Sequence, residues 1–558
     1  MTDRKTSSAS WVLRQAAARA AITLIALVIY WQLGMQDVHS LTKAAAFIVI
    51  ANAGMAGLLL LGYKRKLAAV AAFTLNSLVV LNAAVEGFLF WLYGLEPKHI
   101  VVADAILGSN VNEVHEFIDT YWPHLALVSL LTAAMVALFL WVERRLKAMP
   151  AGTQEAGTWR ERLIGTGMLI LFAALHFNTT MAEENPFVYW PSYLADYREQ
   201  RAFLTEVKGK VAADLVKAQR YPTTYVGPPT QTLVVVLGES VNRSNWSLYG
   251  YPRNTTPKLT AKRDELIAFN NVLSSDAATV QSLLKMLSPA TLKRPDAWLT
   301  EPNVLALARL AGYHVVWLSN QEQGDGPIQI LAEHANEQIF VNNGHGRGTR
   351  SLDERLLPQL KHVLAGKAPL KLIVVHMQGA HLRYDLQYPS AFDKFSGTND
   401  AVASSLYAAG RPYWIRKARD EYDNAMLYTD HVLSSMLQTV AQATPAGPLS
   451  LLYVSDHGQE VGHNRNFAGH SSTDVSGYQV PLLLWQKGRK RVASDYRIAL
   501  EARPYRTDNL DHTLLGLLGI QTPFYQAERD ILSDRFNNPT LLSRHDKCPN
   551  STASVSCI

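Results

Sequence analysis

The distribution of hydrophobic residues divides the chain into two halves. Five apolar segments lie near the N-terminus, and each is close to the roughly 20 residues that a helix needs to cross a bilayer. They are residues 16–33, 44–62, 67–93, 125–142 and 163–181. From Gln231 onward, short aliphatic and β-branched runs alternate with amphipathic stretches of helical period. The pattern predicts a five-helix transmembrane bundle followed by an α/β domain.

Basic residues indicate the orientation of the predicted bundle. Twelve Lys and Arg residues lie at its N-terminal end or in the second and fourth connections, whereas the other two connections contain only Lys43 and Lys98. Because cytoplasmic connections are enriched in Lys and Arg, the N-terminus is predicted to be cytoplasmic. Everything after the fifth segment then lies outside, which in a Gram-negative cell is the periplasm. The expected layout is a transmembrane domain (1–182), an interfacial linker (183–228), a periplasmic domain (229–540) and a tail (541–558).

Three features of this layout leave alternatives open. Glu86, inside the third segment, is a functional candidate or a hydrated residue near the membrane surface. Residues 197–218 have the spacing of a basic amphipathic helix, which either lies on the anionic membrane surface or packs on the periplasmic domain. The only two cysteines, Cys548 and Cys557, form a disulfide in an oxidising compartment or remain free thiols.

The second half predicts a mostly parallel sheet covered by helices. Strand-like runs occupy residues 233–237, 314–318, 370–376, 449–454 and 480–485, and helical patterns lie between them at 280–287, 303–311, 355–364 and 416–437. Such alternation is typical of βαβ units. Residues 390–410 are rich in Ser, Gly and Asp and predict a loop.

Acidic and histidine residues follow the ends of these runs. Glu239 follows the first run, Asp456 and His457 follow the fourth, and His376 and His381 end or follow the third. Because open α/β sheets bind ligands at the carboxyl ends of their strands, these residues predict a metal site at one edge. Carboxylate and imidazole ligands favour Zn²⁺, with Mn²⁺ as the alternative. Alone, Glu239 would equally suit a helix cap.

Thr279 is the candidate nucleophile for this site. It precedes the apolar helical run at 280–287, so it is predicted to lie at a helix N-terminus, where backbone N–H groups and the helix dipole favour an anion. A metal ion at the hydroxyl would favour its ionised form. The alternative is that Thr279 only caps the helix.

Several motifs together resemble the alkaline phosphatase/sulfatase superfamily and, within it, the membrane-bound phosphoethanolamine transferases of lipopolysaccharide. They occur in the order expected for that family and span most of residues 231–534. The motifs are Gly238-Glu239-Ser240, Tyr249-Gly250-Tyr251-Pro252-Arg253, Thr255-Thr256-Pro257, Ser319-Asn320-Gln321, Tyr422-Asp423-Asn424-Ala425, Tyr428-Thr429-Asp430, Ser455-Asp456-His457-Gly458 and Val480-Pro481.

The resemblance implies a sulfatase-like α/β domain and specific roles. Zinc would be held by Glu239, Thr279, Asp456 and His457, and Thr279 would carry phosphoethanolamine taken from phosphatidylethanolamine. The acceptor would be lipopolysaccharide, at lipid A or a core sugar, or another glycolipid, so the partners are membrane lipids and not nucleic acid. The remaining expected site residues are His381 and His470, as catalytic groups or holders of a second metal ion, and Ser109, Glu113, Asn320, Gln321 and His463, as substrate contacts.

The chain also departs from the pattern. It has no cysteine near Thr279 and no cysteine framework in the second half, unlike typical lipid A-modifying members, so the acceptor stays open. A phosphoglycerol transferase using phosphatidylglycerol is the close alternative, and Glu113 favours ethanolamine over it. A sulfatase is disfavoured, because no Cys-x-Pro-x-Arg setting surrounds Thr279. A non-catalytic membrane receptor or scaffold is the alternative from another class.

Overall fold

The computed structural model describes most of the chain, which forms two compact units. The described residues are 8–33, 38–63, 65–93, 111–148, 158–176, short pieces between 188 and 202, and then 218–323, 326–342, 351–444, 447–487 and 494–537. One unit comprises Met1–Ser109 and Tyr121–Arg201, and the other Asn110–Thr120 and Ala202–Ile558. We call them the helical unit and the sheet unit. Ser109, both cysteines and most of the predicted 197–218 helix lie outside the described residues.

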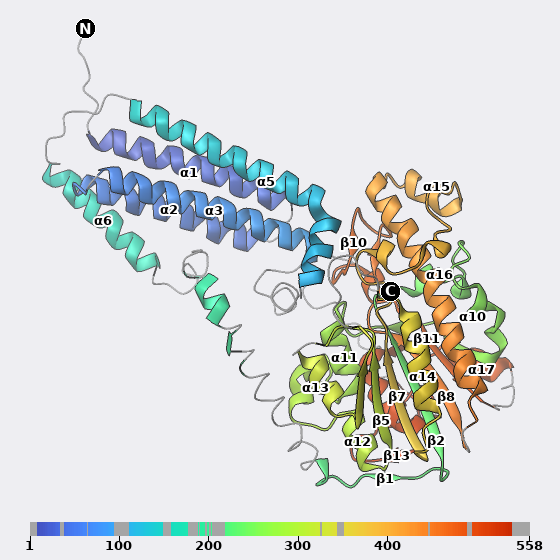
Figure 1. Ribbon diagram of the computed structural model, residues 1–558. Coiled ribbons are helices and arrows are strands. Elements are labelled where there is room, and N and C mark those ends of the chain that lie inside the picture. Colours follow the sequence, from blue (N-terminus) through green and yellow to red (C-terminus); the bar gives the residue numbers. More distant parts are fainter. Residues whose placement is uncertain are drawn as a thin grey trace. The chain divides into compact units, whose positions relative to one another are not determined.

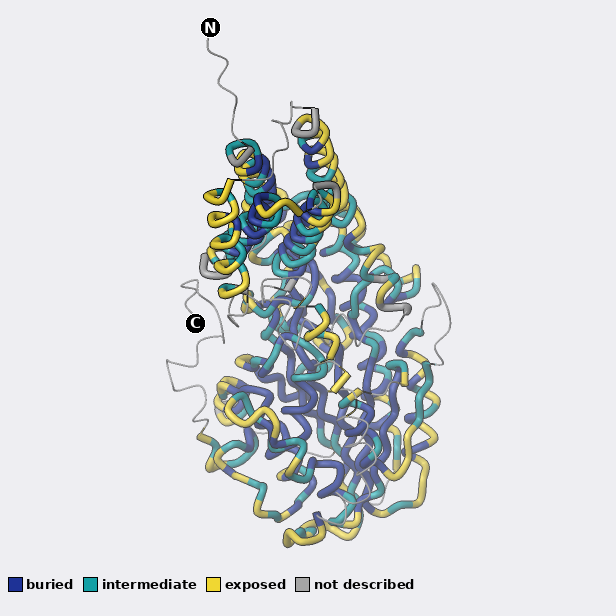
Figure 2. Tube along the Cα trace, turned by 90° about the vertical axis from the view of Figure 1, so that its left-hand side faces the viewer, coloured by how far each residue is buried: buried dark blue, intermediate teal, exposed yellow. Residues whose placement is uncertain are grey.

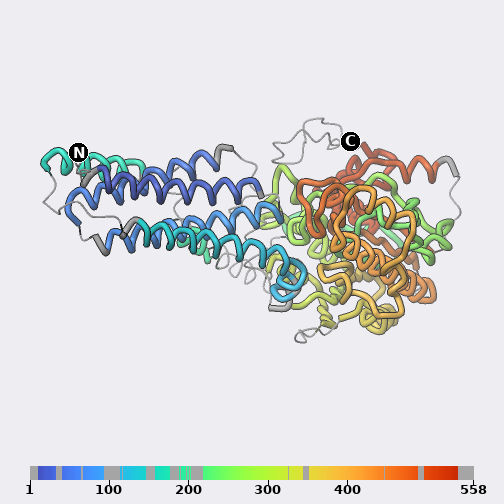
Figure 3. The backbone as a smooth tube through the Cα atoms, turned by 90° about the horizontal axis from the view of Figure 1, so that it is seen from above, coloured from blue at the N-terminus to red at the C-terminus, as the bar shows by residue number. Residues whose placement is uncertain are grey.

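Long apolar helices build the helical unit and run alongside one another (Figures 1 and 3). They are α1 (Ser8–Leu33), α2 (Val38–Leu60), α3 (Arg65–Tyr93), α5 (Val111–Ala148, whose first turns belong to the sheet unit) and α6 (Trp159–His176). Among the described residues, four stretches are long and apolar enough to cross a membrane: Ser10–Gln32, Leu41–Leu60, Leu67–Leu92 and Phe117–Arg145. They overlap the first four predicted spans.

The described part of the fifth predicted span is not apolar enough to count as a membrane-crossing helix. The described part of it, α6, begins with Arg160, Glu161 and Arg162, which lower its hydropathy, and residues 177–181 are outside the described chain. Four membrane-length helices therefore stand where five were predicted. Even so, α6 packs tightly on α2, because a Cβ at Gly57 would lie 2.7 Å from the Gly165 carbonyl oxygen. Small residues allow such close helix contacts in membranes.

Polar side chains are buried between the helices of this unit. The guanidinium of Arg19 on α1 donates to both carboxylate oxygens of Glu143 on α5. Asn52 on α2 and Asn76 on α3 exchange hydrogen bonds of 3.0 and 3.1 Å, and Thr23 on α1 donates to Asn76. Polar groups in an apolar bundle must be paired, so these bonds fix how the helices align. The apolar pattern alone did not reveal them.

A seven-stranded sheet forms the centre of the other unit. Its strand order is β3-β11-β8-β2-β7-β5-β6, in which only β11 runs antiparallel to its neighbours. All five predicted strands are present, and β3 and β6 were not predicted. The strands are β2 (Gln231–Gly238), β3 (Leu266–Phe269), β5 (His314–Ser319), β6 (Glu337–Phe340), β7 (Leu370–His376), β8 (Leu449–Ser455) and β11 (Leu482–Gln486).

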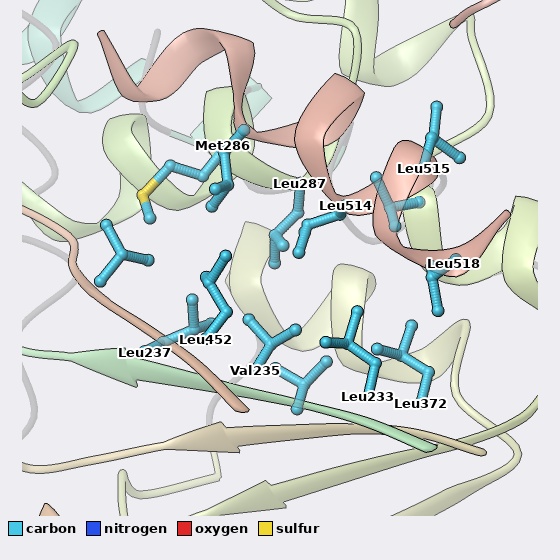
Figure 4. Close-up of a cluster of buried hydrophobic side chains, with 14 of the residues drawn as sticks. Leu233, Val235, Leu237, Met286, Leu287, Leu372, Leu452, Leu514, Leu515 and Leu518 are labelled. Carbon is cyan, nitrogen blue, oxygen red and sulfur yellow. The ribbon is translucent and has the colours of Figure 1, made fainter. Parts of the chain in front are cut away.

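Hydrophobic cores cover both faces of the sheet. Leu233, Val235 and Leu237 of β2 point to one face, where they meet α11 (Thr279–Leu287) and α18 (Leu510–Leu518) (Figure 4). Val234 and Val236 point to the other face, against α14 (Leu356–Leu364) and α16 (Tyr413–Gln442). Each such buried side chain contributes about 1.5–3 kcal/mol relative to exposure. Buried residues accordingly fill the centre of the sheet unit (Figure 2).

Shorter elements complete the sheet unit. Two-stranded sheets pair β1 with β13, β9 with β10 and β12 with β4. The predicted loop at 390–410 is wrong in part, because residues 401–408 form α15, whose N-terminus is capped by Asp400 Oδ1 accepting from the Ala403 N–H. The remaining elements are α10 (Pro257–Ala261), α12 (Val304–Leu310), α13 (Pro327–Glu333), α15 (Ala401–Ala408), α17 (Ser494–Glu501), β1 (Thr224–Tyr225), β4 (Val272–Leu273), β9 (Glu460–Val461), β10 (Ala468–Gly469), β12 (Tyr505–Arg506) and β13 (Ile520–Gln521).

A buried ionic cluster holds the chain that follows β2. Arg253 forms ion pairs of 2.8 Å with Asp400, 2.7 Å with Asp420 and 2.8 Å with Asp423. The Tyr251 hydroxyl donates to the same Asp423 carboxylate at 2.7 Å. The Tyr-Gly-Tyr-Pro-Arg motif is therefore structural: it ties the segment after Glu239 to α16.

Replacing Asp423 by Ala should lower the free energy of unfolding of the sheet unit by about 3–5 kcal/mol, because Arg253 loses a buried partner. The thermal midpoint of the purified full chain measures this. Glu265→Ala is the matched control, since the Glu265 side chain is 56% exposed and should change stability by no more than about 0.5 kcal/mol. Equal midpoints for the two variants would show that the cluster does not stabilise the fold.

Candidate metal and nucleophile site

Side chains from four separate segments meet at the carboxyl ends of β2 and β8. Glu239 follows β2, Asp456 and His457 follow β8, Thr279 begins α11, and His470 follows β10. Thr279 Oγ1 lies 3.0 Å from Glu239 Oε2 and 3.3 Å from His457 Nε2. His457 Nε2 is in turn 3.4 Å from both Glu239 Oε1 and Asp456 Oδ2. The structure thus brings together all four predicted zinc ligands.

Burial differs across the cluster. Glu239, Asp456 and His457 are fully buried, whereas Thr279 and His470 are half-buried. The rings of His457 and His470 pack edge to face with centroids 4.4 Å apart. The cluster therefore has a closed, acidic back and an open side formed by a hydroxyl and an imidazole.

Ser240 connects the groups of the cluster to one another. Its hydroxyl donates to Glu239 Oε1 at 2.7 Å and lies 3.3 Å from His470 Nε2, and its N–H donates to Asp456 Oδ1 at 3.0 Å. These bonds need a left-handed backbone with φ of 60°, which costs a serine on the order of 1–2 kcal/mol. The Tyr422 hydroxyl holds it by donating to the Ser240 carbonyl at 2.6 Å.

A glycine lets the neighbouring strand approach Glu239. Gly379, after β7, has φ of 58°, and a Cβ there would lie 2.5 Å from the Glu239 carbonyl oxygen. Only glycine fits both the conformation and the space. The Ala380 N–H then donates to that same carbonyl at 3.0 Å. The carboxylate is thus positioned from both adjacent strands.

The buried charges in the cluster shift one another's titration. Burial opposes ionisation of Glu239, but the hydrogen bond from His457 and its charge outweigh burial and hold the pKa of Glu239 well below its usual value. Burial, followed by the charge of Glu239, raises the pKa of Asp456. Burial alone would lower the pKa of His457, yet the charge of Asp456 raises it. Two carboxylates therefore compete for one positive charge.

These residues fit a divalent metal ion. Asp456 Oδ2 is buried and has no hydrogen-bond partner among the described residues. Ligand atoms of Glu239, His457 and His470 lie within 4.8 Å of one another, so His470 joins the predicted ligands as a candidate. Burial and the charge of His457 lower the pKa of His470 well below its usual value, which leaves a neutral imidazole with a free electron pair. Oxygen and imidazole donors of this kind suit zinc.

Other predicted site residues have varied surroundings. His381 stands at the open side, with its ring centroid 6.3 Å from that of His470. His463 Nε2 is 2.9 Å from Asn245 Oδ1, so that nitrogen is engaged within the protein. Asn320 Nδ2 donates to Asp353 Oδ1 at 2.8 Å and Gln321 Nε2 to the Met377 carbonyl at 2.8 Å.

Substrate contact by His463, Asn320 and Gln321 stays a prediction. The polar groups named above already form hydrogen bonds inside the protein. Ser109 and the side chain of Glu113 lie outside what the structure describes.

Three residues that support the site were not predicted as site residues, and one strand-end histidine does not belong to the site. Nothing in the residue types of Ser240, Gly379 and Tyr422 indicates acid–base chemistry. Ser240 and Gly379 are recognised by their positive φ, and Tyr422 by its hydrogen bond to the Ser240 carbonyl. His376 had been grouped with the strand-end histidines. Burial lowers its pKa to about 4, and its ring packs against Trp317 with centroids 5.7 Å apart. His376 is therefore a neutral residue of the core.

Known proteins share this architecture along most of the chain. The sulfatase family matches residues 231–520. Phosphoethanolamine transferase EptC of Escherichia coli (strain K12) is 30% identical over 499 residues, which are 82% of this chain and 83% of that protein. Phosphoethanolamine transferase CptA of Salmonella typhimurium is 29% identical over 498 residues, with the same coverage of 82% and 83%.

Solved structures agree with these matches. The C-terminal periplasmic domain of EptC from Escherichia coli, in complex with Zn, has a TM-score of 0.53 and 32% identity, covering 57% of this chain and 90% of that one. The integral membrane lipooligosaccharide phosphoethanolamine transferase A from Neisseria meningitidis has a TM-score of 0.59 and covers 94% of this chain and 97% of that one. At 19% identity, the second likeness shows the fold alone.

The mostly parallel sheet and the acidic, histidine-containing cluster at its edge define an α/β protein of the sulfatase type. The chain belongs to the sulfatase family. Within it, the chain belongs with the phosphoethanolamine transferases, as the identity to EptC over four-fifths of both chains shows.

Removing the Ser240 hydroxyl should weaken metal binding. Ser240→Ala deletes the bond that fixes Glu239 Oε1, and loss of such a supporting bond typically lowers metal affinity about 10–100-fold. Competition with a chromophoric zinc chelator on the purified full chain measures the affinity. Ser244→Ala is the matched control, because the exposed Ser244 hydroxyl bonds only Gln479 Oε1 among the interactions described. Equal affinities for both variants would remove Ser240 from this role.

Proposed function

We propose that this protein transfers phosphoethanolamine from phosphatidylethanolamine to a lipopolysaccharide acceptor, at lipid A or a core sugar, through a covalent intermediate on Thr279. The observation that carries the proposal is the position of Thr279 Oγ1, 3.0 Å from the Glu239 carboxylate at the N-terminus of the nine-residue helix α11. A hydroxyl there has an acceptor for its proton and a helix dipole that favours the phosphate group. The family relation supports the same chemistry.

The proposed reaction has two displacement steps at phosphorus. In the first, Thr279 Oγ bonds to phosphorus, the bond from phosphorus to the diacylglycerol oxygen breaks, and the Thr279 proton leaves along its hydrogen bond to Glu239 Oε2. In the second, an oxygen of the acceptor bonds to the same phosphorus and loses its proton to an imidazole at the open side. The bond from phosphorus to Thr279 Oγ breaks, and Thr279 Oγ regains its proton from Glu239. The products are diacylglycerol and the modified acceptor.

We assign the proton transfers at the open side to His381 and His470. Both are half-buried. His381 would protonate the diacylglycerol oxygen as it leaves, and His470, whose neutral imidazole accepts a proton, would take the proton of the incoming acceptor. The alternative is that the two imidazoles hold a second metal ion.

Glu239, Thr279, Asp456 and His457 would hold one zinc ion. When bound, zinc supplies Lewis acidity at the phosphate oxygens and favours ionisation of the Thr279 hydroxyl. The buried Asp456 Oδ2, which has no hydrogen-bond partner among the described residues, and the competing carboxylates support this assignment. The zinc complex of the EptC domain from Escherichia coli is consistent with it.

We further propose a multi-pass protein of the Gram-negative inner membrane. The four apolar helices, with α6 as a fifth span, would cross the membrane with the N-terminus in the cytoplasm. The sheet unit would then lie in the periplasm, where a lipid donor and a glycolipid acceptor are both available at the membrane.

Thr279→Ala should abolish the covalent intermediate and lower transfer by at least about a thousandfold, the scale seen when a catalytic nucleophile is removed. Mass spectrometry of the protein after incubation with phosphatidylethanolamine labelled in its ethanolamine group detects the adduct. Thr279→Ser keeps a hydroxyl and should still carry the label, whereas Thr291→Ala changes a surface threonine and should behave as wild type. Full transfer by Thr279→Ala would contradict the proposed nucleophile.

Purified protein in proteoliposomes should take its group from phosphatidylethanolamine and not from phosphatidylglycerol. Parallel assays with each lipid, labelled in its head group, measure transfer to added lipopolysaccharide. Label arriving from phosphatidylglycerol would identify the protein as a phosphoglycerol transferase. Transfer from neither lipid, in protein fully loaded with zinc, would favour a non-catalytic membrane protein.

A further inference from the structure

Two tyrosines stand out on the surface of the sheet unit. Tyr407, at the end of α15, is 73% exposed and Tyr413, at the start of α16, is 71% exposed. No other large hydrophobic side chain of the described sheet unit is as exposed. Residues 409–412 connect the two helices, so the two tyrosines flank one helix–helix connection, and Figure 1 shows α15 beside the first turns of α16. Exposed hydrophobic side chains that gather in one place, unlike singly scattered ones, mark candidate interaction sites.

Positive charge without acidic partners surrounds the two rings. The Arg416 guanidinium lies 5.4 Å from the centre of the Tyr407 ring and donates to the Arg411 carbonyl at 2.7 Å. Arg411 itself donates to the carbonyl oxygens of Gly462 at 3.0 Å and His463 at 3.2 Å. Among the described residues, no carboxylate forms an ion pair with either arginine.

The acidic side chains just before α15 and in the first half of α16 pair with other cations, and Glu421 forms an ion pair of 3.3 Å with Lys417. Asp400, Asp420 and Asp423 turn inward to Arg253, with which each forms an ion pair of 2.8 Å or less. The corner formed by Tyr407, Arg411, Tyr413 and Arg416, which we call the α15–α16 corner, is therefore aromatic and cationic. Tyrosine and arginine are the residues enriched where proteins meet the head groups of a bilayer.

The α15–α16 corner lies at the same end of the sheet as the site. Its arginine bonds to Gly462 and His463 join it to the segment that leads into β10 and His470. Under the proposed function, a donor lipid reaches Thr279 while its acyl chains remain in the bilayer. The end of the sheet that carries the site must then face the membrane, and the corner faces it too.

We propose that the α15–α16 corner docks on the anionic phospholipid surface, with Tyr407 and Tyr413 at the depth of the head groups and Arg411 and Arg416 on lipid phosphates. Each arginine near such a surface contributes about fivefold to the docking equilibrium. The inference rests on the proposed function only for the direction in which the site faces. The test below measures membrane contact without any catalytic turnover, so either proposal can be contradicted while the other stands.

Fluorescence quenching tests the contact in the full chain. With Cys548 and Cys557 changed to Ser, a fluorophore is attached at Ser405→Cys, an exposed position of α15 outside the corner residues. A second protein carries it at Lys367→Cys, exposed just before β7 and therefore at the opposite end of the sheet. Proteoliposomes of phosphatidylethanolamine, with or without phosphatidylglycerol, contain a lipid quencher at head-group depth.

Docking predicts stronger lipid quenching at position 405 than at 367, and an increase at 405 alone when phosphatidylglycerol is added. Arg416→Glu should lower the docked-to-free ratio by about fivefold or more, because it removes a cation and adds an anion. Lys361→Glu, at an exposed position of α14, makes the same charge change away from the corner and should have no effect. Equal quenching at the two positions would overturn the proposal. Shielding of position 405 from both lipid and aqueous quenchers would overturn it as well, because protein would then cover the corner.

Discussion

Two buried carboxylates of like charge, Glu239 and Asp456, are the constraint on which the sheet unit depends. The parallel pairing of β2 and β8 sets Gly238 opposite Ser455, so the next residue of each strand is one of these acids. Placing them together in a dry interior is unfavourable, as the raised pKa of Asp456 records. The pairing persists because apolar residues on both faces of β2 hold the strands, while Ser240 donates hydrogen bonds to both acids. The site is thus a region where close carboxylates disfavour the fold and where a bound cation would offset their repulsion.

The residues of the site differ in how deeply they are buried. Glu239, Asp456 and His457 are sealed in, whereas Thr279, His381 and His470 are half-buried. The buried part determines what chemistry the edge can perform, and the half-buried part meets whatever approaches. Most of the motifs that relate the chain to its family belong to the buried part or to its support, as the Arg253 cluster shows. Likeness in those motifs therefore reports the reaction and says little about the acceptor.

The same difference in burial explains which features could be predicted from the sequence. Strands buried on both faces are unbroken apolar runs in the sequence, so all five predicted strands and the convergence of Glu239, Asp456 and His457 were visible in advance. Thr279 was predicted from the helical run at 280–287, and its place among the ligands from the family resemblance. The helix α15 was hidden, because its cap Asp400 sits in a stretch whose composition is that of a loop. The left-handed backbone of Ser240 could not be read, since tertiary bonds impose it on a residue with no such preference. His376 looked like a ligand by position, but its side chain is directed into the core.

The two edges of the seven-stranded sheet bear on how copies of this protein behave beside one another. Chains confined to a membrane meet far more often than chains in bulk solution, and an open strand edge is a template for pairing with a neighbour. Here both edge strands, β3 and β6, are only four residues long. Glu501 of α17 occupies the Ala268 N–H of β3 at 3.0 Å, and β6 begins with the exposed Glu337. Short strands, an occupied N–H and an exposed carboxylate all disfavour pairing between the sheet edges of neighbouring copies.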